Sequence, residues 1–154
     1  MEQRDLERFR VPEVLITERR LADFAARLES GRAAGIALLD DRVCGYGWLS
    51  RQPELDATCG IAISPAEDEG YIYDGFIFSS YRSRRLYEPL LLWRIDRLRK
   101  QGCRKVYSIV FSDNARALSV HRQIGFKACG QISFMKALGF RFLRKYVATD
   151  PGSS

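Results

Sequence analysis

Apolar residues in the first half of the chain are spaced in a way that predicts one helix followed by several strands. Between Thr17 and Gly31 they recur every three or four positions, the period of a helix with one buried face. Shorter apolar runs bounded by turn residues predict strands over residues 36–39, 42–50, 58–64 and 71–79. The pair Asp40-Asp41 stands between the first two runs, as expected for a tight hairpin turn. The first half therefore predicts a mostly antiparallel sheet.

The second half of the chain alternates between helical and strand patterns. Residues 86–101 have apolar positions at helical spacing before Gly102, whereas residues 105–111 form an almost continuous apolar run, typical of a buried strand. A capped helix over residues 114–124 and two closing strands follow, over residues 126–134 and 140–147. This order predicts an α/β (α+β) fold in which helices flank a mixed, mostly antiparallel central sheet with one crossover.

Length and composition favour one domain. The chain has 154 residues, of which 46% are hydrophobic, so we expect a single domain over residues 1–154 with a frayed tail at 149–154. No window approaches the roughly 18 uninterrupted apolar residues of a membrane-spanning helix. Charged residues run through the first ten positions, unlike a secretory signal, and a cytoplasmic protein is expected.

Cysteine and histidine usage predicts no metal site. Cys44, Cys59, Cys103 and Cys129 are scattered without a CxxC pair, and His121 is the single histidine of the sequence. Unpaired cysteines in proteins are mostly internal. We therefore expect free, buried thiols, with neither a zinc site nor a disulfide framework.

The net charge of +6 is concentrated in residues 82–105, which are rich in Arg and Lys and contain only two acids. A parallel strand pair joined by a crossover helix places a ligand crevice at the carboxyl ends of its strands, beside a helix N-terminus. Residues 81–87 lie at that junction. Helix N-terminal amides attract phosphate, and Arg82, Arg84 and Arg85 add positive charge, so this segment is a candidate anion site.

Two blocks of sequence resemble the GCN5-related N-acetyltransferase (GNAT) family. The first is FIFSSYRSRRLYEPLLLW and the second is GCRKVYSIVFSDNARALSVHRQIGF. They follow the family's order of strand, RxxGxG/A, helix, strand, Asn, helix and GF, with Arg82 as the leading Arg. Arg85 and Tyr87 depart from this pattern, because the family usually has small residues there. The resemblance is sharpest from Phe76 to Phe126 and implies a GNAT fold that binds acetyl-CoA or another acyl-CoA.

The resemblance also implies where the cofactor binds. The first strand would diverge from the strand at residues 105–111 and leave backbone groups for the pantetheine arm, with the Ile77 amide near the thioester oxygen. The segment after it would bind the pyrophosphate as a modified cradle supported by arginine charge. Asn114 has helix capping as an alternative role. The implied cofactor-binding residues are Phe76, Ile77, Phe78, Arg82, Ser83, Arg84, Arg85, Leu86, Tyr87, Asn114 and Ala117.

His121 is the first candidate catalytic residue. It stands where the family commonly carries the Tyr that protonates the leaving thiolate, and the resemblance implies the same role. An imidazole, whose ordinary pKa is about 6.5, can donate or accept a proton near neutrality. The alternative is a helix histidine that packs beside Ala117 and Ile124.

Asp74 is the second candidate catalytic residue. It is a lone carboxylate in an aromatic strand, YIYDGFIF, and could act as a base directly or through water. The alternative is an ion pair with an arginine, and in both cases we expect Asp74 to line the acceptor side. Strand alternation places Tyr71 and Tyr73 on the opposite face. Glu69 is the reserve base.

The predicted function is direct transfer of an acetyl or other acyl group from acyl-CoA to an amine of a small metabolite or amino sugar, in a ternary complex. Tyr46, Trp48 and Phe24 are candidates for the acceptor pocket by location, with core packing as the alternative. Two other functions stay open: a non-catalytic protein with the GNAT fold, and a nucleic-acid or anion-binding module that uses residues 82–105.

Partners are less constrained by the sequence than the cofactor. Residues 82–105 show neither interleaved exposed aromatics nor a reading helix, so no nucleic-acid partner is expected. The closing strands are apolar and basic, which would suit a homodimer or a contact with a membrane surface, and no membrane insertion is expected.

Overall fold

The computed structural model describes residues 1–10, 16–56, 59–137 and 140–147. Two compact units divide the chain: the first comprises residues 1–56 and 60–109, and the second comprises residues 57–59 and 110–154. Each unit is described by itself. The expected tail at 149–154 lies outside the described residues, and the single domain over the whole chain stays a prediction.

A four-stranded mixed sheet forms the centre of the first unit. Its strands are β1 (Ala33–Leu39), β2 (Arg42–Ser50), β5 (Glu69–Ile77) and β6 (Lys105–Ser108), in the order β1-β2-β5-β6. The first three strands run antiparallel, and β6 pairs with β5 in parallel. The predicted mixed, mostly antiparallel sheet with a crossover is thereby confirmed.

The hairpin between β1 and β2 closes through two aspartates. Asp40 and Asp41 have φ values of 48° and 62°, and Leu39 pairs directly with Arg42. Two consecutive positive φ values are the signature of the two-residue turn whose twist matches that of paired strands. The predicted turn is confirmed, and β1 begins three residues before the predicted strand.

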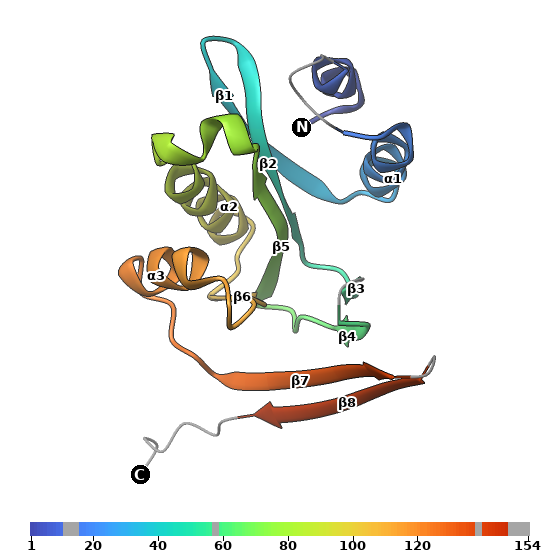
Figure 1. Cartoon of the computed structure of the whole chain (residues 1–154), viewed down its shortest axis with the longest axis vertical. Coiled ribbons are helices and arrows are strands. Elements are labelled where there is room, and N and C mark those ends of the chain that lie inside the picture. The colour runs from blue at the N-terminus through green and yellow to red at the C-terminus, as the bar shows by residue number, and fades with distance from the viewer. Residues whose placement is uncertain (11–15, 57–58, 138–139, 148–154) are drawn as a thin grey trace. The chain divides into compact units, whose positions relative to one another are not determined.

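Helices cover both faces of this sheet (Figure 1). The 3-10 helix η1 (Gln3–Phe9) and helix α1 (Glu18–Glu29) lie on one face, and helix α2 (Tyr87–Lys100) lies on the other. The side-chain oxygen of Thr17 accepts a hydrogen bond from the Arg20 backbone N–H at 3.2 Å, which caps α1 as predicted. The sequence did not predict η1 or the 3-10 helix η2 (Ser79–Arg84), because neither follows the 3.6-residue period.

Aromatic side chains form the core between α1 and the sheet. Phe24 and Trp48 are fully buried, with ring centroids 5.3 Å apart, and Tyr46 packs beside them. Burial of one large apolar side chain contributes roughly 1.5–3 kcal/mol. On the other face α2 buries Leu91 and Leu98. The sheet is therefore held by packing on both faces. The strand that the sequence predicts to be buried, over residues 105–111, is β6, which stands last in the strand order and has only exposed and partly buried residues, so that prediction of burial is wrong.

The remaining elements are short or belong to the second unit. In the first unit β3 (Glu54–Asp56) and β4 (Ile61–Ile63) form a small separate sheet. The predicted strand over 58–64 begins outside the described residues, and within 59–64 the strand is confined to β4. In the second unit helix α3 (Ala115–Gln123) follows Asn114, and β7 (Gly130–Ala137) pairs antiparallel with β8 (Phe140–Val147). The strand predicted over 126–134 begins four residues late, at Gly130.

Candidate functional site

Strand β5 contains a bulge at Asp74. Tyr73 pairs with Trp48 and Phe76 pairs with Tyr46, so two β5 residues oppose one residue of β2. Asp74 has a φ of 46°, in the left-handed region that non-glycine residues rarely adopt. Such outliers persist where surrounding contacts determine the backbone, and they cluster at functional sites.

The bulge changes which face Asp74 occupies. The Arg27 guanidinium lies 5.5 Å from the Tyr73 ring centroid, and its Nη1 lies 2.7 Å from Asp74 Oδ2. Both side chains therefore reach the α1 face. The prediction that Tyr73 and Asp74 lie on opposite faces is wrong, because the extra residue interrupts the alternation. Tyr71 and Tyr73 share a face, with rings stacked 5.3 Å apart, as expected.

Strands β5 and β6 separate just before the bulge. They pair only over Glu69–Ile72 and Lys105–Ser108, whereas β5 continues to Ile77. The Phe78 N–H donates to the Cys44 carbonyl of β2 at 2.9 Å. Because antiparallel strands alternate the direction of their backbone groups, those of Ile77 point to the opposite edge, the one that β6 has left. The predicted divergence is confirmed, although β6 ends at Ser108 rather than at residue 111.

Helix α2 begins beside this open edge. It has no side-chain cap, so the N–H groups of its first turn are not satisfied by a capping side chain. Arg85 precedes the helix and has a φ of 53°. The side chains of Arg84 and Arg85 are both exposed. Arg82 lies with Nε 3.3 Å from the Ile77 carbonyl oxygen and its guanidinium 5.4 Å from the Phe76 ring. The basic segment and the open edge are thus brought together.

Asp74 is paired with two arginines of α1. Arg20 Nη2 lies 2.6 Å from both carboxylate oxygens, and Arg27 Nη1 lies 2.7 Å from one. Burial lowers the pKa of Arg20, but the hydrogen bond with Tyr46 and the charge of Asp74 outweigh it and raise that pKa overall. Burial, and then the charge of Asp74, raises the pKa of Tyr46. The sequence alternative of an arginine ion pair describes the geometry, and Arg20 and Arg27 are partners that the sequence did not reveal.

Glu69, the reserve base, lies at the other end of β5. Hydrogen bonds from the Ala66 N–H and the Tyr107 hydroxyl hold its pKa below the usual range. It begins the strand, whereas Asp74 lies near its end, so the structure does not bring the two carboxylates together. Phe24, Tyr46 and Trp48, the acceptor-pocket candidates, are buried in the α1-side core, which is their alternative role.

Arg94 is a buried cation that the sequence analysis did not single out. Arg94 is 2% exposed and lies on the side of α2 that faces the sheet. A Cβ at Gly47 or Gly75 would come within 2.8 or 2.9 Å of its guanidinium. Helical spacing between the buried Leu91 and Leu98 was a signal that position 94 faces the sheet.

The second unit carries the other predicted site residues. The Asn114 side chain accepts a hydrogen bond from the Ala117 N–H at 3.1 Å and caps α3. His121 is 5% exposed, with its ring 5.0 Å from that of Phe126. Its Nδ1 lies 2.8 Å from the Ala117 carbonyl oxygen, and because a carbonyl only accepts, Nδ1 carries the hydrogen. Nε2 is then the ring atom at which the neutral imidazole takes up a proton.

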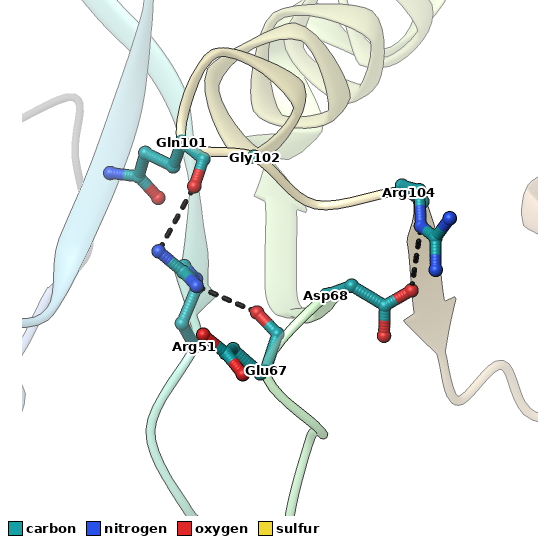
Figure 2. A pocket seen from close by; sticks show the side chains of 6 residues that line it. All are labelled: Arg51, Glu67, Asp68, Gln101, Gly102 and Arg104. Atoms are coloured by element: carbon teal, nitrogen blue, oxygen red, sulfur yellow. Dashed lines mark hydrogen bonds and ion pairs between the residues drawn. The ribbon is translucent and has the colours of Figure 1, made fainter.

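A polar surface hollow of about 540 Å³ lies at the far end of α2 (Figure 2). Arg51 donates to the backbone carbonyls of Gln101 and Glu67 at 3.0 and 2.7 Å, and Arg104 pairs with Asp68 at 2.9 Å. The hollow is at the C-terminal end of α2, whereas the predicted phosphate-binding segment is at its N-terminal end. Its charged groups hold the loop ends together.

The basic stretch 82–105 does not form one continuous surface. Arg94 is buried, while Lys100 pairs with Asp96 at 2.7 Å and Arg104 pairs with Asp68. This arrangement gives no support to a continuous nucleic-acid-binding face within the described residues.

Other sequence predictions concern thiols, metals and membranes. Cys44, Cys59 and Cys103 are free and buried, as predicted, but Cys129, just before β7, is exposed, so the prediction of burial is wrong there. Across the described residues, no three His, Cys, Asp or Glu side chains gather as metal ligands. None of the helices in this part of the chain is long and apolar enough to span a membrane.

Comparison with known proteins decides the family. The model of the Acetyltransferase (GNAT) family matches residues 2–126. This chain belongs to the GNAT acetyltransferase family. No protein of curated function matches this GNAT sequence significantly.

Solved structures share the GNAT fold. Aminoglycoside N-acetyltransferase AAC(6')-Iy, in complex with CoA, is 22% identical with a TM-score of 0.65 over 89% of this chain and 96% of that one. An acetyltransferase of Trypanosoma brucei is 23% identical with a TM-score of 0.59, over 89% and 96% of the two chains. A ribosomal-protein-alanine N-acetyltransferase of Brucella melitensis is 15% identical with a TM-score of 0.63, over 96% of both chains.

Acetyl-CoA is the acetyl donor of the GNAT family, which confirms the predicted cofactor. The residues of this chain fit it. The open edge of β5 offers backbone groups for an extended amide chain, as in strand addition. The uncapped start of α2 and the exposed arginines Arg84 and Arg85 suit phosphate groups.

Proposed function

We propose that this GNAT protein transfers an acetyl group from acetyl-CoA to an amine of a small metabolite or amino sugar, directly in a ternary complex. The separation of β5 from β6, at an edge that leads to the uncapped N-terminus of α2, is the observation that carries the proposal. The aminoglycoside N-acetyltransferase among the structural neighbours was also solved with a bisubstrate analogue, CoA-S-monomethyl-acetylneamine. That complex supports an amino sugar as the first acceptor class to test.

The proposed cofactor site begins on β5. The Ile77 backbone would bind the pantetheine amides and hold the thioester oxygen, flanked by Phe76 and Phe78. The pyrophosphate would lie at the segment that precedes and opens α2, where Leu86 provides the uncapped end. The proposed phosphate-binding residues are Arg82, Ser83, Arg84, Arg85, Leu86 and Tyr87. Bound acetyl-CoA supplies the activated thioester, and these residues bind and orient it.

His121, Asn114 and Ala117 are the proposed site residues that belong to the second unit. His121 would hold a proton on Nε2 and give it to the leaving sulfur, with the Ala117 carbonyl fixing the ring through Nδ1. Asn114 would keep the start of α3 ordered through its cap and contact the cofactor. The packing of His121 against Phe126 would restrict the ring to one orientation.

Asp74 would act on the acceptor side of the proposed site. Both of its oxygens accept hydrogen bonds from guanidinium groups. These bonds occupy the lone pairs with which a general base would accept a proton. A role for Asp74 as base therefore needs Arg20 or Arg27 to move when the acceptor binds. Without that movement, Asp74 fixes the bulge and α1 beside the acceptor, and water takes the proton from the amine.

Thiol release from acetyl-CoA, measured over a panel of amino sugars, small amines and N-terminal peptides, tests this proposal. We expect amine-dependent release for at least one small amine, and a kcat lowered about 100-fold or more in His121→Ala if His121 is the acid. Ser119→Ala on the exposed side of α3 is the control and should retain activity. Thiol release that depends only on peptides, or that is absent with every amine, would contradict the proposed acceptor class.

The cytoplasmic location and the homodimer remain predictions.

A further inference from the structure

The buried guanidinium of Arg94 contacts the bulge of β5. Its Nη1 lies 3.4 Å from the Tyr73 carbonyl oxygen, directly before Asp74, and its Nε lies 3.3 Å from the Leu90 carbonyl oxygen of its own helix. A Cβ at Gly75, directly after Asp74, would come within 2.9 Å of Arg94 Nη2. The guanidinium therefore contacts the backbone just before the left-handed residue and fills the space that a side chain would need just after it.

Two glycines on neighbouring strands make room for this cation. Gly47 on β2 lies opposite the bulge, and its hypothetical Cβ would come within 2.8 Å of Arg94. A side chain at either glycine would displace the guanidinium. Because a buried charge without compensation is costly, the space and the carbonyl contacts around Arg94 indicate a specific place for it rather than incidental burial.

Arg94 also reaches the start of its own helix. The Tyr87 ring centroid lies 6.0 Å from the guanidinium carbon, and Tyr87 is the first residue of α2. Burial lowers the pKa of Arg94, and the interactions with Tyr87 and the charge of Asp74 oppose that change. One side chain thus contacts the two structures between which the cofactor is proposed to extend, the β5 bulge and the α2 N-terminus.

The bulge is held from both faces of the sheet. Arg20 and Arg27 of α1 hold the Asp74 side chain on one face, and Arg94 of α2 holds the adjoining backbone on the other. A left-handed aspartate stays in place only where its surroundings determine it. Loss of Arg94 would free the bulge on the α2 face while the α1 contacts remain.

We propose that Arg94 is a positioning residue for acetyl-CoA, because it fixes the open edge of β5 relative to the first turn of α2. It does not itself touch the reacting atoms. The inference rests on the proposed function, since it assumes that the cofactor lies along these two structures. Disturbing Arg94 should weaken acetyl-CoA binding in a protein that remains folded.

Arg94→Lys and Arg94→Met test this role. Lys keeps the positive charge, but it lacks the planar guanidinium that contacts the Tyr73 carbonyl and the Tyr87 ring at the same time. Met removes the charge and keeps a long apolar side chain. We expect both to raise the Kd and KM of acetyl-CoA about tenfold or more, and kcat and the acceptor KM at saturating acetyl-CoA to stay within about twofold. Arg97→Met, an exposed position on α2, is the control and should match the wild type.

Tyr87→Phe keeps the test decisive if an Arg94 variant does not fold. It removes only the hydroxyl, and we expect a several-fold increase in the acetyl-CoA Kd. In a double variant with a folded Arg94 substitution, the increase in Kd should be smaller than the product of the two single increases. Wild-type affinity in folded Arg94→Lys and Arg94→Met, or in Tyr87→Phe where neither folds, would overturn the inference. If the wild type itself does not bind acetyl-CoA, the proposed function fails instead.

Discussion

Nη2 of Arg20 lies 2.6 Å from both carboxylate oxygens of Asp74, although 54 residues separate the two in the sequence. The pair joins α1 to the bulge of β5 and places a charge cluster on the side of the sheet opposite α2. It also compensates for the left-handed backbone of Asp74, whose φ is 46°.

Asp74→Asn should destabilise the fold through loss of charge alone, because Asn tolerates the left-handed conformation. Hydrogen bonds to charged groups contribute roughly 1.5–3 kcal/mol, and the partial exposure of this cluster reduces the expected loss to about 1–2 kcal/mol. Urea unfolding measures it. Asp96→Asn breaks an exposed pair with Lys100 and should cost no more than about 0.5 kcal/mol. Equal costs for the two variants would show that the Asp74 pairs contribute little.

Gly47→Ala should be destabilising because its new methyl group meets the Arg94 guanidinium. Overpacking of this kind costs about 1–3 kcal/mol. The same substitution in an Arg94→Ala background should cost much less, because the guanidinium is gone. Unfolding free energies of the four proteins give the coupling, and strictly additive costs would argue against direct contact.

Arg85 should prefer glycine to alanine. Its φ is 53°, and a left-handed residue with a Cβ costs roughly 1–2 kcal/mol that glycine avoids. We expect Arg85→Gly to be more stable than Arg85→Ala by about 1 kcal/mol. At the neighbouring Arg84, which has no left-handed φ, alanine should be the more stable of the two. A preference for alanine at both positions would contradict the loop conformation before α2.

Stability should fall at low pH in part through Glu69. Hydrogen bonds lower its pKa in the folded state below the ordinary value of 4.5, so its stabilisation is present above that pH and is lost as pH falls through the folded pKa. Thermal unfolding between about pH 5 and pH 3 should therefore show a smaller fall in Tm for Glu69→Gln than for the wild type. Glu29→Gln, at an exposed position, should follow the wild type. Parallel curves for all three proteins would contradict the assignment.

The sequence predicted those parts of the fold that repeat a local pattern. Thr17 and Asn114 both cap helices, and the aspartate pair at 40–41 forms the hairpin turn, because each signal lies within a few residues of its effect. The divergence of β5 and β6 was predicted from the family resemblance rather than from periodicity. The short helix η2 was missed because three-residue periods are hard to distinguish from turns.

The candidate site was less predictable than the fold because its contacts join distant residues. Asp74 was identified as a lone carboxylate, but Arg27, its partner, is 47 residues away. The bulge turns Asp74 to the α1 face, and none of the residues that precede Asp74 in the strand signals the bulge. Arg94 looked like part of a basic stretch, and although helical spacing pointed position 94 toward the sheet, the space that Gly47 and Gly75 leave for its guanidinium is set by the strands of the fold.

The central claim is that acetyl-CoA binds along the open edge of β5 and at the start of α2. Calorimetric titration of acetyl-CoA into the wild type, Arg82→Ala and Arg99→Ala tests it most directly, since Arg99 is an exposed residue in the last turn of α2. We predict micromolar binding to the wild type and to Arg99→Ala, and about tenfold weaker binding to Arg82→Ala, which is about 1.4 kcal/mol. No binding to the wild type, or equal affinity in all three proteins, would contradict the account.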